Sequence, residues 1–358
     1  MSSSSTAALS IQELQQEFSA RTGYLNTASI GVPPRSMIEL LHAELDRWAR
    51  GEWTAPQFDA VVAEARRGYA ELTRVPVESV AIGSAASPFV GQVVSSLPRG
   101  SEVLYAKDDF TSLLFPILER ARAGELRVRE VELEGLIDAI RPETTMVAVS
   151  LVQSATGEVV DAEALVQAAR QNDASTLVDA TQAVGWHPFD ASKLDYVVTA
   201  AYKWLLSPRG VAYMSVRPER LEALRARNAG WYAGEDVWRS VYGAPLRLAN
   251  SARRFDISPA WLSWVGAASV MPTLQRVGVA SIGEHNVALA RRFAERAGLP
   301  EPRSAIVRVP QLKAAEALRA AGFVVSERNG ATRLSFHLYN TEAEADRAAA
   351  VVRSSGGG

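Results

Sequence analysis

The chain has 358 residues, of which 47% are hydrophobic and 22% charged, and its formal net charge is -2. This near-neutral balance, without a long basic run, argues against nucleic acid as the main partner and against an electrostatic membrane anchor, and it favours small-molecule chemistry. The sequence contains no cysteine, which excludes disulfides, thiolate metal sites and a cysteine nucleophile.

The chain begins with the serine-rich stretch MSSSSTAALS, which lacks the basic and apolar regions of a signal peptide. Residues 1–24 are expected to form a disordered leader followed by a segment that packs on a small C-terminal domain. No apolar run approaches the length of a membrane span, which is about 20 residues. We therefore expect a cytoplasmic protein without a membrane or nucleic-acid partner.

Residues 25–250 are expected to form a large α/β domain. Between residues 80 and 216, amphipathic helical patterns separate the apolar runs VAIG, EVLYA, LRVREVE, MVAVSLV, TLVDA, YVVTAA and VAYMSV. Strands that are apolar on both faces are typical of a mostly parallel sheet with helices on both sides. The last of these seven strands is expected to be antiparallel, because only the short segment KWLLSPRG precedes it.

Residues 251–358 are expected to form a small α+β domain. Helix-rich sequence is followed by the strand-like runs SAIVRV, FVVSER and TRLSFHL. The Asn329-Gly330 pair predicts a tight hairpin turn, and Thr341 with Glu344 has the spacing of a capping box at the start of the last helix. The tail SSGGG is expected to be disordered.

The residues that follow the strands are candidates for a site, because ligands of α/β sheets bind at the carboxyl ends of the strands. Residues 84–87 open a helix after the first strand, where free backbone N–H groups suit a phosphate; a plain helix cap is the alternative. Phe110 follows the second strand and could present its ring to a planar ligand or pack in the core.

Asp179 ends the fifth strand and Lys203 follows the sixth. A carboxylate at the end of a buried strand needs a cationic partner, so the two side chains could form a structural salt bridge or face one pocket. Pyridoxal 5′-phosphate uses all four of these groups, because its aldehyde needs a lysine amine, its ring nitrogen a carboxylate and its phosphate a helix N-terminus. No metal is expected.

The run VDATQAVGWHPFDASKLDYVVTAAYKWLLSPRG resembles the class V aminotransferase group of fold-type I pyridoxal-phosphate enzymes, which includes cysteine desulfurases, kynureninase, isopenicillin N epimerase-like proteins and C–S lyases. The resemblance extends from YLNTASIGVPP near the start to TRLSFHLYNTEAEADR near the end, and so covers nearly the whole chain. It implies the fold-type I architecture, with pyridoxal 5′-phosphate as the cofactor.

The resemblance also implies how the cofactor is held. Lys203 would form the Schiff base, Asp179 would contact the pyridine nitrogen, and Gln182 would hydrogen-bond the phenolic oxygen. Phe110 takes the ring-stacking position. Contacts with the phosphate would come from Ala86, Ser87, Tyr202 and, across a subunit interface, Ser258. That last match implies a homodimer with shared active sites.

On the substrate side, Arg333 falls on the arginine that binds the α-carboxylate; from the sequence alone the alternative is a surface arginine on a hairpin. The resemblance also places Asn26 and Tyr232 among the substrate-binding residues, with Trp231 and Trp261 near the entrance.

Other positions depart from the pattern or lie outside it. Ser154 replaces the asparagine commonly found beside the cofactor. His187 and His337 have no role in the scheme and are expected to be structural or rim residues.

Removal of the substrate Cα proton would give a quinonoid intermediate that leads to transamination, epimerisation or β-elimination, with Lys203 as the general base in each. We expect a class V-like aminotransferase that acts on an α-amino acid, with a C–S β-lyase or an amino-acid epimerase as alternatives. A persulfide-forming cysteine desulfurase is excluded, because the chain has no cysteine to accept sulfur. A non-enzymatic chain is disfavoured, because Lys203, Asp179 and Arg333 are retained together.

Overall fold

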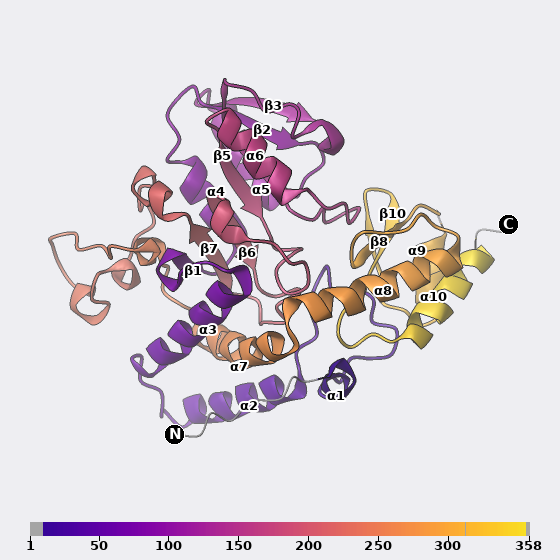
Figure 1. Ribbon diagram of the computed structural model, residues 1–358. Helices are drawn as coiled ribbons and strands as arrows, with labels where there is room; N and C mark the ends of the chain where they lie inside the picture. Colours follow the sequence, from indigo (N-terminus) through magenta and orange to yellow (C-terminus); the bar gives the residue numbers. More distant parts are fainter. Residues whose placement is uncertain (1–9, 312, 356–358) are drawn as a thin grey trace, which may run out of the picture.

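The computed structural model describes residues 10–311 and 313–355, and a seven-stranded sheet lies at the centre of its larger domain (Figure 1). The strand order is β1-β7-β6-β5-β4-β2-β3. The strands are β1 (Val80–Gly83), β2 (Glu102–Ala106), β3 (Arg127–Val131), β4 (Thr144–Ser150), β5 (Ser175–Asp179), β6 (Tyr196–Ala200) and β7 (Ala212–Val216). Strands β2 to β6 pair in parallel, whereas β7 is antiparallel to both β6 and β1, as the sequence predicts.

Helices cover both faces of this sheet, and alternate residues of each central strand enter two separate apolar cores. Val147 and Val149 of β4 pack in one core, and Met146 and Ala148 pack in the other. Helices α3 (Gln57–Thr73), α6 (Ala162–Gln171) and α7 (Trp261–Val277) cover the first face, while α4 (Ala86–Val94) and α5 (Thr111–Arg122) cover the second. Burial on both faces explains why these strands are apolar throughout.

The smaller domain holds a three-stranded antiparallel sheet in the order β8-β10-β9. Its elements are α8 (Val279–Ala297), β8 (Ile306–Val309), α9 (Ala314–Ala320), β9 (Ser326–Arg328), β10 (Ala331–Ser335) and α10 (Glu342–Ser355). Asn329 and Gly330 join β9 to β10 with φ angles of 44° and 70°, which confirms the predicted hairpin. The Thr341 hydroxyl accepts from the Glu344 N–H, and the Glu344 carboxylate accepts from the Thr341 N–H, which confirms the capping box.

The N-terminal segment packs against the smaller domain. After α1 (Ile11–Gln15), the Leu25 N–H donates to the Val324 carbonyl at 3.0 Å, and Leu25 is buried in the small apolar core. Of the predicted leader MSSSSTAALS, residues 1–9 lie outside the described residues, whereas Ser10 caps α1. Of the tail SSGGG, predicted to be disordered, Ser354 and Ser355 belong instead to α10, and the three glycines lie outside the described residues. In residues 10–311 and 313–355, no helix has both the length and the apolarity needed to cross a membrane.

The sequence predicts a domain boundary at residue 250, but the first long helix after it packs on the larger domain and the second runs into the smaller one. Helix α7 packs against α3 and α2 (Arg35–Ala49) of the larger domain. The long helix α8 then leads from α7 to α10 in the smaller domain (Figure 1). Residues 251–277 therefore contribute mainly to the larger apolar core.

A buried ion pair fixes the outer edge of the large sheet. Arg66 of α3 donates to the Asp256 carboxylate through Nη1 and Nη2, at 3.1 and 2.6 Å, and both side chains are almost fully buried. Asp256 also accepts from the Ile82 N–H at 2.9 Å, and the Arg66 Nη1 also donates to the Val80 carbonyl. This pair ties α3 and the segment before residue 258 to strand β1.

We expect Asp256→Asn to lower the free energy of unfolding by about 3 kcal/mol, because it leaves the buried Arg66 guanidinium without its counter-ion. The midpoint of urea unfolding measures the loss. Glu119→Gln is the control, because Glu119 pairs with Arg122 on the exposed face of α5 and should cost less than about 0.5 kcal/mol. Equal effects of the two changes would contradict this role for the buried pair.

Candidate active site

Lys203 lies just beyond the end of β6, and its side chain is 5% exposed. Its Nζ lies 5.2 Å from the centroid of the Phe110 ring and 5.7 Å from that of Tyr202. Phe110 precedes α5, at the end of the loop that follows β2, and is 41% exposed. The structure therefore brings together the predicted lysine, the predicted ring-stacking residue and Tyr202, and leaves the Phe110 ring accessible to a ligand.

The environment of Lys203 favours its neutral amine. Burial lowers the pKa of Lys203 to about 8, because it disfavours the charged form; the nearby Asp179 opposes this shift, and Arg333 and Arg328 add to it. An amine with a pKa near 8 is available as a nucleophile and as a base at neutral pH, unlike an exposed lysine.

Asp179, the last residue of β5, is buried at the same edge of the sheet. Its Oδ1 accepts from the Thr181 N–H at 2.8 Å. Burial raises the pKa of Asp179, and the hydrogen bonds from Thr181 and the charge of Lys203 offset part of that rise. In the part of the chain that the structure describes, Asp179 forms no ion pair, so its carboxylate suits the protonated ring nitrogen of pyridoxal 5′-phosphate.

Gln182 is held in one orientation by three hydrogen bonds. Its Oε1 accepts from the Trp204 indole N–H at 2.7 Å, and its Nε2 donates to the Ala28 carbonyl at 3.0 Å and to the Ser154 hydroxyl at 3.1 Å. An indole can only donate, so Trp204 sets which end of the amide faces Ser154. The sequence did not predict this role for Trp204, although the residue adjoins Lys203.

Arg333, on β10 of the smaller domain, is 2% exposed and so is not a surface arginine. Its Nη1 donates to the Ser154 carbonyl at 2.6 Å and to the Ser154 hydroxyl at 3.0 Å. Its Nη2 donates to the Ser29 hydroxyl at 2.7 Å, and its Nε to the Ser326 hydroxyl at 3.1 Å. All of these acceptors are neutral.

The charge of Arg333 therefore has no counter-ion among the described residues. Burial lowers the pKa of Arg333 to about 10, and the charge of Arg328 adds to this shift. A buried guanidinium without a carboxylate partner is costly, so an arriving carboxylate gains the full charge-assisted interaction.

Asn26 and Ser29 support this arginine. The Ser29 hydroxyl donates to Asn26 Oδ1 at 2.7 Å, which leaves its lone pairs for Arg333. Asn26 pairs with Ser335, two residues beyond Arg333, through an isolated β-bridge. The structure thus places Asn26 beside the predicted carboxylate site, and it adds Ser29, which the sequence did not single out.

The start of α4 suits a phosphate. Its N-cap residue, Ala85, makes no side-chain capping hydrogen bond, so the first backbone N–H groups at Ala86 and Ser87 are not capped by a side chain. A Cβ at Gly83, at the end of β1, would lie 2.8 Å from the Phe89 ring, so the turn before α4 is closely packed. This donor set fits the phosphate contacts predicted for Ala86 and Ser87.

Asp109 is a buried site residue that the sequence did not predict. Its carboxylate accepts from the Ser150 N–H at 2.7 Å, from Gln153 Nε2 at 3.0 Å and from the Phe110 N–H at 2.6 Å. It therefore fixes the start of α5 at Phe110 and the residue before Ser154. The one sequence signal was an acidic residue directly before Phe110 at the end of a strand.

Tyr232 and Ser258 lie away from this cluster within the chain. Tyr232 is buried, and its hydroxyl donates to Asp59 Oδ1 at 3.1 Å on α3. Ser258 is exposed two residues beyond Asp256. The described residues show no hydrogen bond from either side chain to Lys203 or Arg333, so the substrate role of Tyr232 and the cross-subunit role of Ser258 stay predictions.

His337 is fully buried behind the Lys203 loop. Its Nε2 lies 3.1 Å from the Trp204 carbonyl, which can only accept, so Nε2 carries the proton and Nδ1 accepts from Asn286 Nδ2 at 3.2 Å. Burial lowers the pKa of His337 to about 3, so the ring is neutral. These contacts agree with the structural role expected from the sequence.

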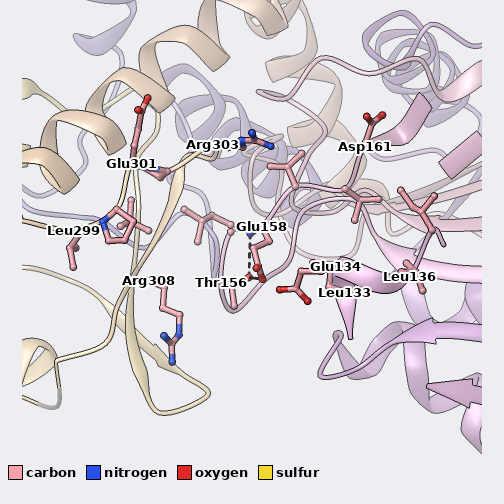
Figure 2. Close-up of a pocket in the computed structure, with 18 residues that line it drawn as sticks. Leu133, Glu134, Leu136, Thr156, Glu158, Asp161, Leu299, Glu301, Arg303 and Arg308 are labelled. Atoms are coloured by element: carbon pink, nitrogen blue, oxygen red, sulfur yellow. Dashed lines mark hydrogen bonds between the residues drawn. The ribbon is translucent and has the colours of Figure 1, made fainter. Parts of the chain in front are cut away.

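A separate cavity of about 540 Å³ lies between the two domains, beyond the loop that follows Ser154 (Figure 2). Thr156 and Glu158 of that loop line one side, and Leu299 and Arg308 of the smaller domain line the other (Figure 2). Lys203, Asp179 and Arg333 do not line it. This cavity is therefore separate from the catalytic candidates.

The chain matches a known protein family and several known proteins. Residues 54–305 match the family model described as aminotransferase class-V. The chain is 27% identical over 310 residues to an uncharacterized aminotransferase, YcbU, of Bacillus subtilis, which covers 78% of this chain and 80% of that protein. It is 28% identical over 264 residues to isopenicillin N epimerase of Streptomyces clavuligerus, which covers 67% of this chain and 66% of the epimerase.

Solved structures share the fold at low sequence identity. The apo cysteine desulfurase of Thermococcus onnurineus superposes with a TM-score of 0.83 at 20% identity, covering 97% of this chain and 98% of the other. A complex of the cystine C–S lyase C-DES with its product cysteine persulfide superposes with a TM-score of 0.82 at 19% identity, covering 93% and 98%. These matches establish the fold-type I architecture expected from the sequence.

The lowered pKa of Lys203 predicts the pH dependence of cofactor attachment. When pyridoxal 5′-phosphate is added to the apoprotein, the rate at which the absorption of the bound cofactor appears should rise with pH and level off above a midpoint near 8, because the neutral amine is the nucleophile. Stopped-flow absorption measures the profile. Arg333→Gln should move the midpoint upward, because the Arg333 charge helps to lower the pKa of Lys203. A rate that keeps rising to about pH 10, as for an ordinary lysine, would show that burial does not shift this group.

Proposed function

This chain belongs to the class-V aminotransferase family and uses pyridoxal 5′-phosphate, and we propose that it is an aminotransferase acting on an α-amino acid. The observation that supports the proposal is that two buried basic side chains, Lys203 and Arg333, lie near each other and differ in their chemical properties. Lys203 has a pKa near neutrality, and Arg333 has no carboxylate partner among the described residues. The first suits proton transfer and the second suits an α-carboxylate.

When bound, the cofactor supplies an electron sink for negative charge at the substrate Cα. Asp179, at the end of β5, would keep the ring nitrogen protonated, and the Phe110 ring would pack against the cofactor plane. The N–H groups of Ala86 and Ser87 would bind the phosphate. Gln182 Nε2, which donates to Ala28 and Ser154, would exchange its bond with Ser154 for one with the phenolic oxygen, so that this chain relies on Gln182 and Ser154 where an asparagine is common.

Arg333 would hold the substrate α-carboxylate and thereby orient the Cα–H bond toward Lys203. Ser29 and Ser154 position the guanidinium through neutral hydrogen bonds that do not cancel its charge. Lys203 Nζ would then remove the Cα proton and deliver a proton to the cofactor carbon that receives the amino group. One base therefore serves both positions.

The choice among reactions follows from the number of bases. The proposal assigns Asp179 to the ring nitrogen and Arg333 to the α-carboxylate, so Lys203, whose pKa is lowered to about 8, is the one base that it provides at Cα. This favours a one-base reaction over an epimerisation that uses two bases on opposite faces of Cα. An amino-acid epimerase remains the second candidate, because two relatives are isopenicillin N epimerases. Elimination by a C–S lyase also uses one base, and product analysis separates it from transamination.

A homodimer with shared active sites is part of the proposal. Ser258 is exposed, as a residue that reaches a neighbouring subunit must be. Helix α2 exposes Ile38, Leu45 and Trp48, a largely apolar set that a second copy of the chain could cover.

Asp179→Asn should reduce turnover by about 100-fold or more while the protein still folds and binds the cofactor, because a neutral amide no longer stabilises the protonated ring nitrogen. Steady-state assays, circular dichroism and cofactor absorption measure the three properties. Asp161→Asn is the matched control, because Asp161 caps the exposed start of α6 and asparagine caps equally well. Full activity in Asp179→Asn would reduce Asp179 to a structural residue.

A single turnover with a reactive amino acid should leave the cofactor in its amine form and release a 2-oxo acid without ammonia. Absorption spectroscopy, ammonia assay and mass spectrometry of the products measure this outcome. Release of ammonia and a thiol with the cofactor still in its aldehyde form would make the enzyme a lyase. Solvent deuterium at Cα without a 2-oxo acid would make it an epimerase. Borohydride reduction should fix the cofactor on Lys203, and labelling of another lysine would overturn the site itself.

A further inference from the structure

A second arginine lies beside the predicted carboxylate site. Arg328 ends β9, which pairs antiparallel with β10, and Arg333 of β10 stands opposite Ser326. Residues two apart on a strand share a face, so Arg328 projects from the same face of the small sheet as Ser326 and Arg333. Unlike Arg333, Arg328 is exposed.

The two guanidinium groups share one hydroxyl oxygen. Ser29 Oγ accepts from Arg333 Nη2 at 2.7 Å and from Arg328 Nη2 at 3.4 Å. The Ser29 hydroxyl donates its own proton to Asn26 Oδ1, so both of its lone pairs face the arginines. The Arg328 guanidinium therefore lies beside that of Arg333 at the predicted carboxylate site.

Arg328 brings positive charge to this site, and the described residues do not neutralise it. Its neighbour Glu327 pairs with Arg319, and Arg328 Nη1 donates to the backbone carbonyl of Glu327 at 2.6 Å. The positive charge of Arg328 also lowers the pKa of both Lys203 and Arg333. The site thus has one more cation than the binding of a single α-carboxylate requires.

We propose that Arg328 binds a second carboxylate at the far end of the substrate, so that the enzyme takes a dicarboxylic amino acid, the matching 2-oxo dicarboxylic acid, or both. The inference rests on the proposed function, because it assumes that Arg333 binds the α-carboxylate. A guanidinium can bind a carboxylate through two parallel hydrogen bonds, and the exposed, flexible side chain of Arg328 can adjust to the length of the substrate.

Unreactive acids test the binding of the second carboxylate without turnover. Isothermal titration of the holoenzyme should show that glutarate binds about tenfold more tightly than pentanoate, which has the same chain length and one carboxylate. Arg328→Ala should remove most of that preference and weaken pentanoate binding much less than glutarate binding, and Arg328→Lys should keep part of the preference. Arg308→Ala is the matched control: Arg308 stands opposite Arg333 on β8 but lines the other cavity (Figure 2), so the preference should survive.

Two further arms identify the natural source of the dicarboxylate. In the first, glutamate and aspartate are compared with glutamine and asparagine by the change in cofactor absorption. In the second, 2-oxoglutarate is compared with 2-oxopentanoate by titration of the amine form of the holoenzyme. If Arg328→Ala loses the preference in the first arm alone, the dicarboxylate is the amino donor. If it loses the preference in the second arm alone, the dicarboxylate is the acceptor. If it loses the preference in both arms, both half-reactions use a dicarboxylate.

The inference is wrong if glutarate and pentanoate bind wild-type protein equally, if Arg328→Ala keeps the preference, or if Arg308→Ala removes it to the same extent. These results would leave the proposed function intact as long as neutral amino acids still change the cofactor absorption. Failure of the proposed function looks different: amino acids would then leave the cofactor absorption unchanged or leave the cofactor in its aldehyde form, whichever of glutarate and pentanoate binds more tightly.

Discussion

The site depends on the burial of positive charge that the protein itself leaves unneutralised. Lys203 and Arg333 are both nearly inaccessible, and the hydrogen-bond acceptors of Arg333 are serine hydroxyls and a backbone carbonyl. Such acceptors satisfy the N–H groups and fix the guanidinium, but they contribute little opposing charge. The lowered pKa values of both groups reflect the free-energy cost of burying a charge that is not neutralised. An anionic ligand removes it, so the same feature that destabilises the free protein favours binding.

The residues that surround this buried charge come from both domains. Arg333 comes from the small sheet, Ser154 from the loop after β4, and Ser29 from the segment before α2. A second link joins His337, beyond β10, to the carbonyl of Trp204 beside Lys203. The distance between the base and the carboxylate site is therefore set by how the small domain rests on the large sheet. Changes at that boundary would affect binding and proton transfer together.

The sequence predicted the elements whose signals are local. Apolar runs placed the seven strands because burial on both faces leaves a continuous pattern, and the Asn329-Gly330 pair placed the hairpin because a tight turn needs positive φ angles. Asp179, Lys203 and Phe110 could be predicted as neighbours because strand ends of one sheet meet at one edge. Ser29, Asp109, Trp204 and Arg328 were missed because their partners lie far away in the chain. The packing of α7 on α3 was also missed, because α7 follows the predicted boundary and its contact with α3 joins segments far apart in the chain.

In the proposed reaction Lys203 moves its Nζ between two carbons while its backbone stays fixed, and contacts with the surrounding chain hold that backbone. The Tyr202 carbonyl accepts from the Gly31 N–H at 2.9 Å, and the Lys203 carbonyl accepts from the Leu206 N–H at 3.1 Å. Leu206 has a φ of 55°, an uncommon conformation for a branched residue that the tight loop imposes. A Cβ at Gly31 would overlap the Lys203 carbonyl, so only glycine allows this close approach. Backbone strain and close packing therefore hold the lysine in place, and the motion needed for proton transfer is left to its four-carbon side chain.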